Sequence, residues 1–83
     1  MTEREIQLLG LQREEIKEHD EDDSYYYVMD IVDGLALITP ASDEVKDGNW
    51  YVEIFETDPY IRFTEFGEVQ ALINLLNSRI VKK

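Results

Sequence analysis

The stretch "HDEDDSYYY", residues 19–27, places one histidine and four consecutive acids just ahead of three tyrosines. Acids at this spacing could form a metal-binding loop, or an acidic patch that imitates phosphate groups for a basic partner. They could also form only a solvated turn that enters a strand. The calcium loop is the most specific of these possibilities, because its ligand positions are fixed along the chain.

A calcium loop needs oxygen ligands at positions one, three and five, a glycine at position six and a bidentate acid at position twelve. Counted from Asp20, the side chains of Asp22 and Ser24 fit the first positions. Position six is then Tyr25 and position twelve is Ile31, which supply neither the turn nor the charge. The sequence therefore favours a solvated turn over a calcium loop.

A looser divalent site could still use Asp20, Asp22 and Asp23, with or without His19. Histidine occurs once in the chain and cysteine is absent. This composition excludes multi-histidine metal sites, thiolate chemistry and a disulfide scaffold. We expect no bound metal ion and no cofactor.

Catalysis by paired carboxylates would need a cleft that raises the pKa of one carboxyl by burial. Asp30 is the acid that stands inside an apolar run, and strand alternation puts it on the face that we assign to solvent. The four glycines are dispersed along the chain, so no phosphate-binding loop is present. We therefore expect no enzymatic activity.

Nineteen acids against eight bases give the 83-residue chain a formal net charge of −11. This charge opposes direct contact with nucleic acid or anionic lipid and favours a basic protein partner. No apolar run approaches the roughly 20 residues that span a bilayer, and the N-terminus lacks the pattern of a signal peptide. We expect a single domain over residues 1–83, cytoplasmic and without membrane contact.

The N-terminal residues indicate a short helix followed by a strand. Thr2 and Glu5 have the spacing of a capping box and Gly10 can end the helix, so we predict a helix over residues 3–9. Residues 11–19 are ambiguous, because their helix propensity is high but they follow a glycine that has just ended a helix. We choose a strand there, with the acidic run as the turn of a hairpin.

A "DG" dipeptide between two β-rich runs predicts the next hairpin. A three-residue loop over residues 32–34 pairs Ile31 with Leu35 and Met29 with Leu37. It separates an apolar face from a mixed face better than a two-residue turn does. The apolar face then carries Tyr25, Tyr27, Met29, Ile31, Leu35 and Leu37. The opposite face carries Tyr26, Val28, Asp30, Ala36 and Ile38.

The segments "NWYVEIFE" and "YIRF" predict a further hairpin, because apolar side chains alternate in the first and a turn separates the two. Its register places Val52 beside Phe63. It also leaves Glu53 opposite Arg62 on the outer face, where an opposite-charge pair contributes a few tenths of a kcal/mol.

Thr64 can cap a C-terminal helix whose first turns carry acids and whose end carries cations. Apolar residues recur in it at three- and four-residue steps and form one stripe, Phe66, Val69, Leu72, Ile73, Leu76 and Ile80. We predict an α+β fold: an antiparallel meander of four or five strands with a short N-terminal helix and a long C-terminal helix packed on one sheet face.

The segment order "YYYVMDI…DGNWYVEIF…PYIRFTEFGEVQALINLL" resembles a type of short acidic reading frame found in the genomes of bacteria and their viruses. The resemblance covers most of the chain from Tyr25 onward. It consists of a tyrosine-rich strand, a "WYVEIF"-like strand, an "IRF"-like strand and a final amphipathic helix. No activity and no site residues are assigned to that type, so the resemblance implies none here.

Four aromatic residues would share the sheet face away from the C-terminal helix, with Glu53 at their border: Tyr26, Tyr51, Phe55 and Tyr60. An aromatic patch with a charged rim is typical of a contact surface. The N-terminal helix or strand could cover this patch, or a partner or second copy could cover it instead. Our hypothesis is a small acidic protein-interaction module without catalytic activity, which binds a basic protein partner or self-associates through this face.

The alternative is an acidic inhibitor that imitates nucleic acid and occupies the binding groove of a DNA- or RNA-binding protein. It predicts carboxylates spaced like phosphates along one face and strong weakening of binding by salt. The module hypothesis predicts an interface centred on the aromatic residues and a mild dependence on salt.

Overall fold

The computed structural model describes residues 1–16 and 24–81, which form two α-helices, a short 3₁₀ helix and five strands. In chain order these elements are α1 (Glu3–Leu8), β1 (Gln12–Ile16), β2 (Ser24–Val32), β3 (Leu35–Ile38), η1 (Ser42–Glu44), β4 (Val52–Ile54), β5 (Arg62–Phe63) and α2 (Phe66–Ser78).

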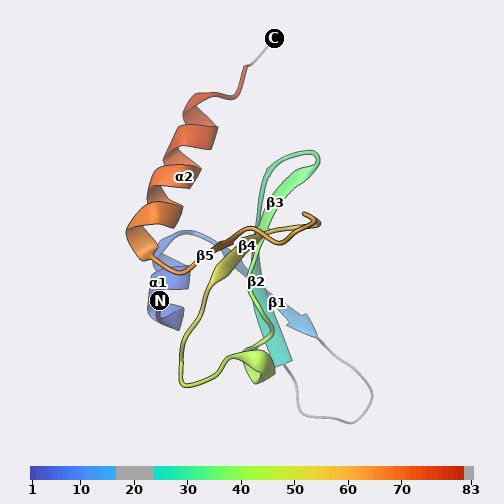
Figure 1. The fold of residues 1–83 in the computed structure, drawn as a ribbon, viewed down its shortest axis with the longest axis vertical. Helices are drawn as coiled ribbons and strands as arrows, with labels where there is room; N and C mark the ends of the chain where they lie inside the picture. Colours follow the sequence, from blue (N-terminus) through green and yellow to red (C-terminus); the bar gives the residue numbers. More distant parts are fainter. Residues whose placement is uncertain (17–23, 82–83) are drawn as a thin grey trace.

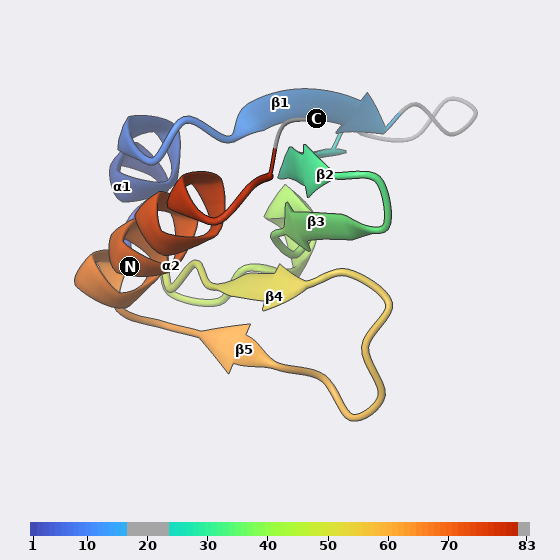
Figure 2. The same cartoon turned by 90° about the horizontal axis from the view of Figure 1, so that it is seen from above.

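The five strands form one sheet in the order β1-β2-β3-β4-β5, and each neighbouring pair is antiparallel (Figure 1). Both helices lie on the same side of this sheet (Figure 2). The predicted α+β meander is confirmed, with five strands rather than four. Helix α2 has 13 residues, so it is modest in length rather than long.

The hydrophobic core lies between the two helices and the sheet face that they cover, which we call the inner face. Helix α1 contributes Ile6 to it, and α2 contributes Val69 and Ile73. From the sheet, Leu37 and Val52 are fully buried against them. The predicted packing of the C-terminal helix is confirmed, and α1 shares the same face.

The start of the chain follows its sequence signals. Thr2 and Glu5 form the capping box: the Glu5 amide donates to the Thr2 hydroxyl at 3.2 Å and the Thr2 amide donates to the Glu5 carboxylate at 2.8 Å. Gly10 then takes a φ of 95°, where a side chain would be strained. The choice of a strand for residues 11–19 is confirmed over Gln12–Ile16, and residues 17–19 lie outside the described part of the chain.

The first predicted hairpin is right in its centre and wrong at its end. Met29 lies opposite Leu37 as expected, but Val32 rather than Ile31 lies opposite Leu35. The reason is a bulge within β2 before Val32, which shifts the register by one residue and leaves a two-residue turn. Ile31 still packs against the core, so the bulge keeps the apolar face while the turn tightens.

The second predicted hairpin is confirmed in register. Val52 lies opposite Phe63, and Glu53 lies opposite Arg62. Strand β4 is nevertheless shorter than the alternation in "NWYVEIFE" suggests: it spans only Val52–Ile54.

Backbone contacts with Met1 occur just before β4. The Trp50 amide donates to the Met1 carbonyl at 2.8 Å, so this part of the chain pairs with the N-terminus instead of extending the strand. The N-cap prediction for α2 is wrong by one position: Glu65 is the cap residue, and its side chain makes no capping bond. The Thr64 carbonyl instead accepts a hydrogen bond from the Met1 ammonium at 3.2 Å.

Candidate functional site

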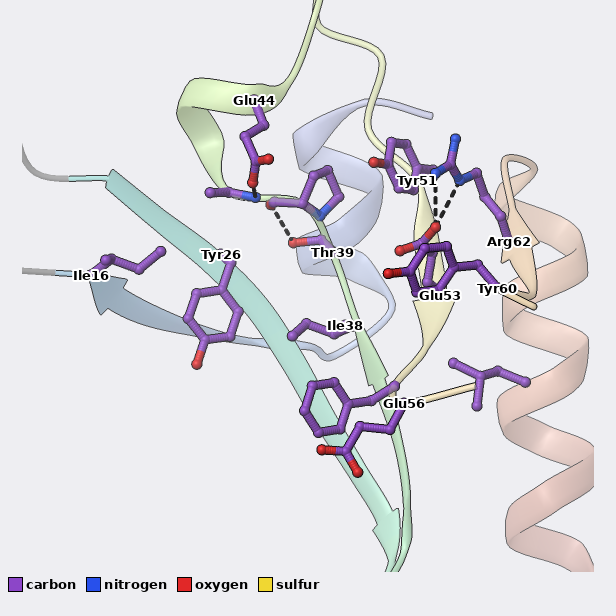
Figure 3. A pocket seen from close by; sticks show the side chains of 14 residues that line it. Ile16, Tyr26, Ile38, Thr39, Glu44, Tyr51, Glu53, Glu56, Tyr60 and Arg62 are labelled. Atoms are coloured by element: carbon purple, nitrogen blue, oxygen red, sulfur yellow. Dashed lines mark hydrogen bonds and ion pairs between the residues drawn. The ribbon is translucent and has the colours of Figure 1, made fainter. Parts of the chain in front are cut away.

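A groove of about 600 Å³ opens on the sheet face opposite the helices, which we call the outer face (Figure 3). All five residues singled out from the sequence line this outer groove, namely Tyr26, Tyr51, Glu53, Phe55 and Tyr60. They come from β2, from β4 and its flanking residues, and from the segment before β5. The antiparallel meander thus brings together side chains that are up to 34 positions apart, from position 26 to position 60.

One wall of the groove comes from residues 39–44, which bond to β2 through one backbone amide and two side-chain hydroxyls: the Thr39 amide donates to the Tyr27 carbonyl at 3.0 Å. Thr39 Oγ1 accepts from the Tyr27 amide at 2.9 Å, and Ser42 Oγ accepts from the Tyr25 amide at 3.1 Å. Each hydroxyl substitutes for the carbonyl that a neighbouring strand would offer. The chain therefore follows β2 beyond the end of β3, and Ile38, Thr39, Pro40 and Ala41 line the groove there.

The opposite wall contains a stacked ion pair. The Arg62 guanidinium lies over the Tyr51 ring at 3.9 Å from its centroid, and Nε and Nη2 contact Glu53 Oε2 at 2.9 and 2.8 Å (Figure 3). The Glu53 side chain is 19% exposed and that of Arg62 is 50% exposed. The hydrogen bond to Glu53 raises the pKa of Arg62 above its ordinary value.

The connection between β4 and β5 presents the remaining aromatic side chains to solvent. The Phe55 amide donates to the Ala36 carbonyl at 2.9 Å, which fixes the start of this loop on β3. Glu56 follows with a φ of 61°, a left-handed conformation that is uncommon outside glycine. Phe55 is 48% exposed and Tyr60 is 75% exposed, although both are large aromatic residues.

Acidic side chains border the aromatic ones. Glu44, Glu53 and Glu56 line the outer groove against a single guanidinium. A second cavity of about 380 Å³ shares Glu56 with it and adds Asp30 and Asp33 from the β2–β3 hairpin. The outer face therefore combines exposed aromatic area with an excess of negative charge.

The inner face holds a different aromatic group, which we call the inner aromatic cluster: Tyr25, Tyr27 and Trp50. Trp50 stacks on Tyr25 with ring centroids 6.1 Å apart and meets Tyr27 edge to face at 5.6 Å. The Tyr27 hydroxyl donates to Glu3 at 2.8 Å and accepts from Gln7 at 3.1 Å. Burial raises the pKa of Tyr27, and the bond to Glu3 adds to this effect while the bond from Gln7 opposes it. This cluster belongs to the core.

His19 and the four acids that follow it, residues 20–23, lie outside the described part of the chain. The prediction that they form a solvated turn therefore stays a prediction. Within residues 1–16 and 24–81, no three potential metal-ligating side chains gather at one point. The same residues contain no helix long and apolar enough to cross a membrane. Asp30 is exposed, as its assignment to the solvent side predicts.

Sequence reasoning missed the wall formed by Pro40, Ala41 and Glu44, because these residues belong to no periodic pattern. It placed Arg62 opposite Glu53 but not over the Tyr51 ring. The N-terminal helix was one candidate to cover the aromatic patch, and α1 lies on the inner face instead.

No protein-family model, curated protein or solved structure matches this chain.

Proposed function

We propose that this chain is a small protein-interaction module without catalytic activity, which binds a basic protein partner through the outer groove. The observation that carries the proposal is the gathering of four aromatic side chains and three carboxylates around one groove on the face away from the helices. Aromatic anchors surrounded by charged groups are what protein-binding surfaces use.

The exposed aromatic area supports a contact with another molecule. A chain that buries Tyr27 to 3% exposure on one face leaves Tyr60 75% exposed on the other. Fully burying a large apolar side chain stabilises a protein by roughly 1.5–3 kcal/mol relative to leaving it in water. Most of this free energy is not gained by a side chain that stays exposed. A partner that covers Phe55 and Tyr60 would recover part of this free energy on binding.

The charge supports a basic partner over a second copy. Two copies that meet through this face would bring together acidic rims, each on a chain of formal charge −11. Like-charge contact at an interface costs several kcal/mol, whereas a basic surface is attracted and steered to the groove. Self-association is therefore the less favoured form of this proposal.

The test compares a groove variant with a matched surface variant. Phe55→Ser with Tyr60→Ser removes the exposed aromatic area of the groove and keeps every acid. Leu8→Ser removes a comparably exposed apolar side chain, 61% exposed, from α1. A protein captured by the wild-type chain is purified, and its affinity for each variant is measured by calorimetry.

The proposal expects the double variant to lose about 2 kcal/mol or more of binding free energy, as hot-spot aromatic residues do. It expects Leu8→Ser to bind like the wild type. Equal binding by all three proteins would overturn it. Sedimentation velocity of the free chain reports self-association separately.

The acids Asp30, Asp33, Glu44, Glu53 and Glu56 on the outer face support the alternative, an acidic inhibitor that imitates nucleic acid. Salt separates the two functions. A nucleic-acid imitation loses affinity steeply with salt and tolerates the loss of Phe55 and Tyr60, because its contacts are carboxylates. The module shows the opposite behaviour in both measurements.

A further inference from the structure

We propose that Tyr51 and Glu53 form a guanidinium-binding site, which Arg62 fills in the free protein and which an arginine of the partner takes over on binding. The inference rests on the proposed function and deepens it, because it names the side chain that the groove recognises.

The first support is the chemistry of the contact itself. A guanidinium binds best where it can stack on an aromatic ring and direct its N–H groups at a carboxylate. Arg62 does both at once, at 3.9 Å from the Tyr51 centroid and 2.8–2.9 Å from Glu53 Oε2. The site is therefore built for this cation, and a guanidinium from another chain would meet the same two groups.

The second support is the unequal burial of the pair. The Glu53 side chain is only 19% exposed and lies in the sheet, whereas Arg62 is 50% exposed and belongs to the two-residue edge strand β5. The carboxylate is fixed, and the cation can leave by rotation of its own side chain into solvent. A half-exposed ion pair of this kind holds its partners together with little net free energy.

The third support is charge. Beside Glu53 the groove carries Glu44 and Glu56, so it keeps an excess of carboxylates while Arg62 is in place. If the Arg62 side chain rotates out of the groove, the groove becomes more negative. A guanidinium from the partner can then neutralise the same carboxylates in place of Arg62. A partner arginine would thus exchange with Arg62 rather than add to it.

The chain contains its own control. Arg13 lies over the Tyr25 ring at 3.7 Å and pairs with Glu15 at 2.8 Å, but Arg13 lies in β1, at the far edge of the sheet from β5, and does not line the groove. Arg13→Gln and Arg62→Gln remove the same charge and the same kind of stacked ion pair. Only the second change vacates the proposed site.

The experiment measures the fluorescence anisotropy of a labelled peptide of alternating arginine and glycine as each purified protein is added. A second peptide with lysine in place of arginine has the same charge. Arg62 competes with the peptide for the site. Its stacking on Tyr51 and its surface ion pair with Glu53 together favour the occupied site by about fivefold, and removing Arg62 removes this competition. Arg62→Gln is therefore expected to bind the arginine peptide about fivefold more tightly than the wild type.

Arg13→Gln is expected to change this affinity less than about twofold, through its general effect on charge alone. Glu53→Gln added to Arg62→Gln is expected to weaken arginine-peptide binding about tenfold, because a charge-assisted hydrogen bond is lost. The lysine peptide is expected to gain less from Arg62→Gln, since an ammonium cannot both stack flat and make two N–H contacts.

Equal gains for Arg62→Gln and Arg13→Gln, or equal gains for the two peptides, would overturn the guanidinium site. So would a failure of Arg62→Gln to bind the arginine peptide at all. These results leave the broader proposal intact if the Phe55→Ser, Tyr60→Ser variant still loses its protein partner. If that variant binds like the wild type, the module itself is wrong.

Discussion

The two faces of the sheet use the same residue types for opposite purposes. On the inner face, Tyr25, Tyr27 and Trp50 pack ring against ring beneath the helices. On the outer face, Tyr51 contacts a guanidinium, Phe55 is about half exposed and Tyr60 is largely exposed. Neighbouring positions of a strand alternate between these faces, so a run of three tyrosines supplies both.

The difference lies in what satisfies each polar group. The buried Tyr27 hydroxyl has both a donor and an acceptor at hand, in Gln7 and Glu3, and no buried side-chain polar atom of the described residues lacks a partner. On the outer face, water can still reach much of the polar and aromatic surface. The inner face is therefore satisfied within the chain, whereas the outer face leaves Phe55 and Tyr60 exposed to solvent.

The largest expected contrast comes from truncating one aromatic residue on each face. Trp50→Ala, at a position 5% exposed, should lower the free energy of unfolding by about 3–5 kcal/mol, because it leaves a large cavity among packed rings. Tyr60→Ala should change it by no more than about 0.5 kcal/mol. Urea denaturation followed by circular dichroism measures both.

If Trp50→Ala does not fold, Trp50→Phe provides a smaller truncation for the same comparison. A Tyr60→Ala variant as unstable as the Trp50 variant would mean that the outer aromatic residues hold the fold together. The contrast between the faces would then be lost.

A second, intermediate effect is expected at Thr39, which lines the groove and also bonds to the backbone of the inner cluster. Thr39→Val leaves the buried Tyr27 amide without its acceptor and should cost about 1–3 kcal/mol of unfolding free energy. Thr57→Val is the matched control, since its hydroxyl accepts from the more exposed Ile61 amide, which water can bond instead. Chemical denaturation of both variants gives the difference, and equal losses would contradict this role of Thr39.

The smallest effect concerns the hydroxyl of Tyr27. Tyr27→Phe removes its bonds to Glu3 and Gln7 and should cost about 1 kcal/mol at neutral pH. The pKa of Tyr27 is raised above its ordinary 10.0, chiefly by burial, so ionisation favours the unfolded chain. The stability tied to this group is present below pH 10 and is lost as pH rises through the raised pKa.

Melting temperatures measured from neutral to strongly alkaline pH check this sign. Wild-type protein should lose stability in alkali more steeply than Tyr27→Phe. An alkaline loss that is identical in Tyr27→Phe and the wild type would show that this hydroxyl is not the group that resists ionisation.

The sequence predicts most of the fold because the strands pair in chain order. Alternation places Val52 opposite Phe63 and Glu53 opposite Arg62, and the capping box defines the start of α1. The bulge before Val32 is harder to foresee, because a bulge and a longer loop both keep the apolar face apolar.

The site is predictable on the strands and on the residues that flank them, and less so elsewhere. Tyr26, Tyr51, Phe55 and Tyr60 follow from alternation and from the register of the second hairpin. The wall at residues 39–44 is held partly by the two hydroxyls that bond to β2, at Thr39 and Ser42, and a serine or threonine in a loop has many other uses. Side-chain hydrogen bonds of this kind produce no periodic pattern in the sequence, so sequence patterns do not predict them.

The strict chain order of the meander has a consequence for how fast the protein folds. Each strand pairs with its sequence neighbour, so the sheet can grow one hairpin at a time and each step closes only a short stretch of chain. Contacts between distant segments, such as Met1 with Trp50, are needed only to close the core beneath the helices. We expect refolding faster than that of β-proteins whose strands pair out of chain order, and stopped-flow fluorescence of Trp50 would record the closing step.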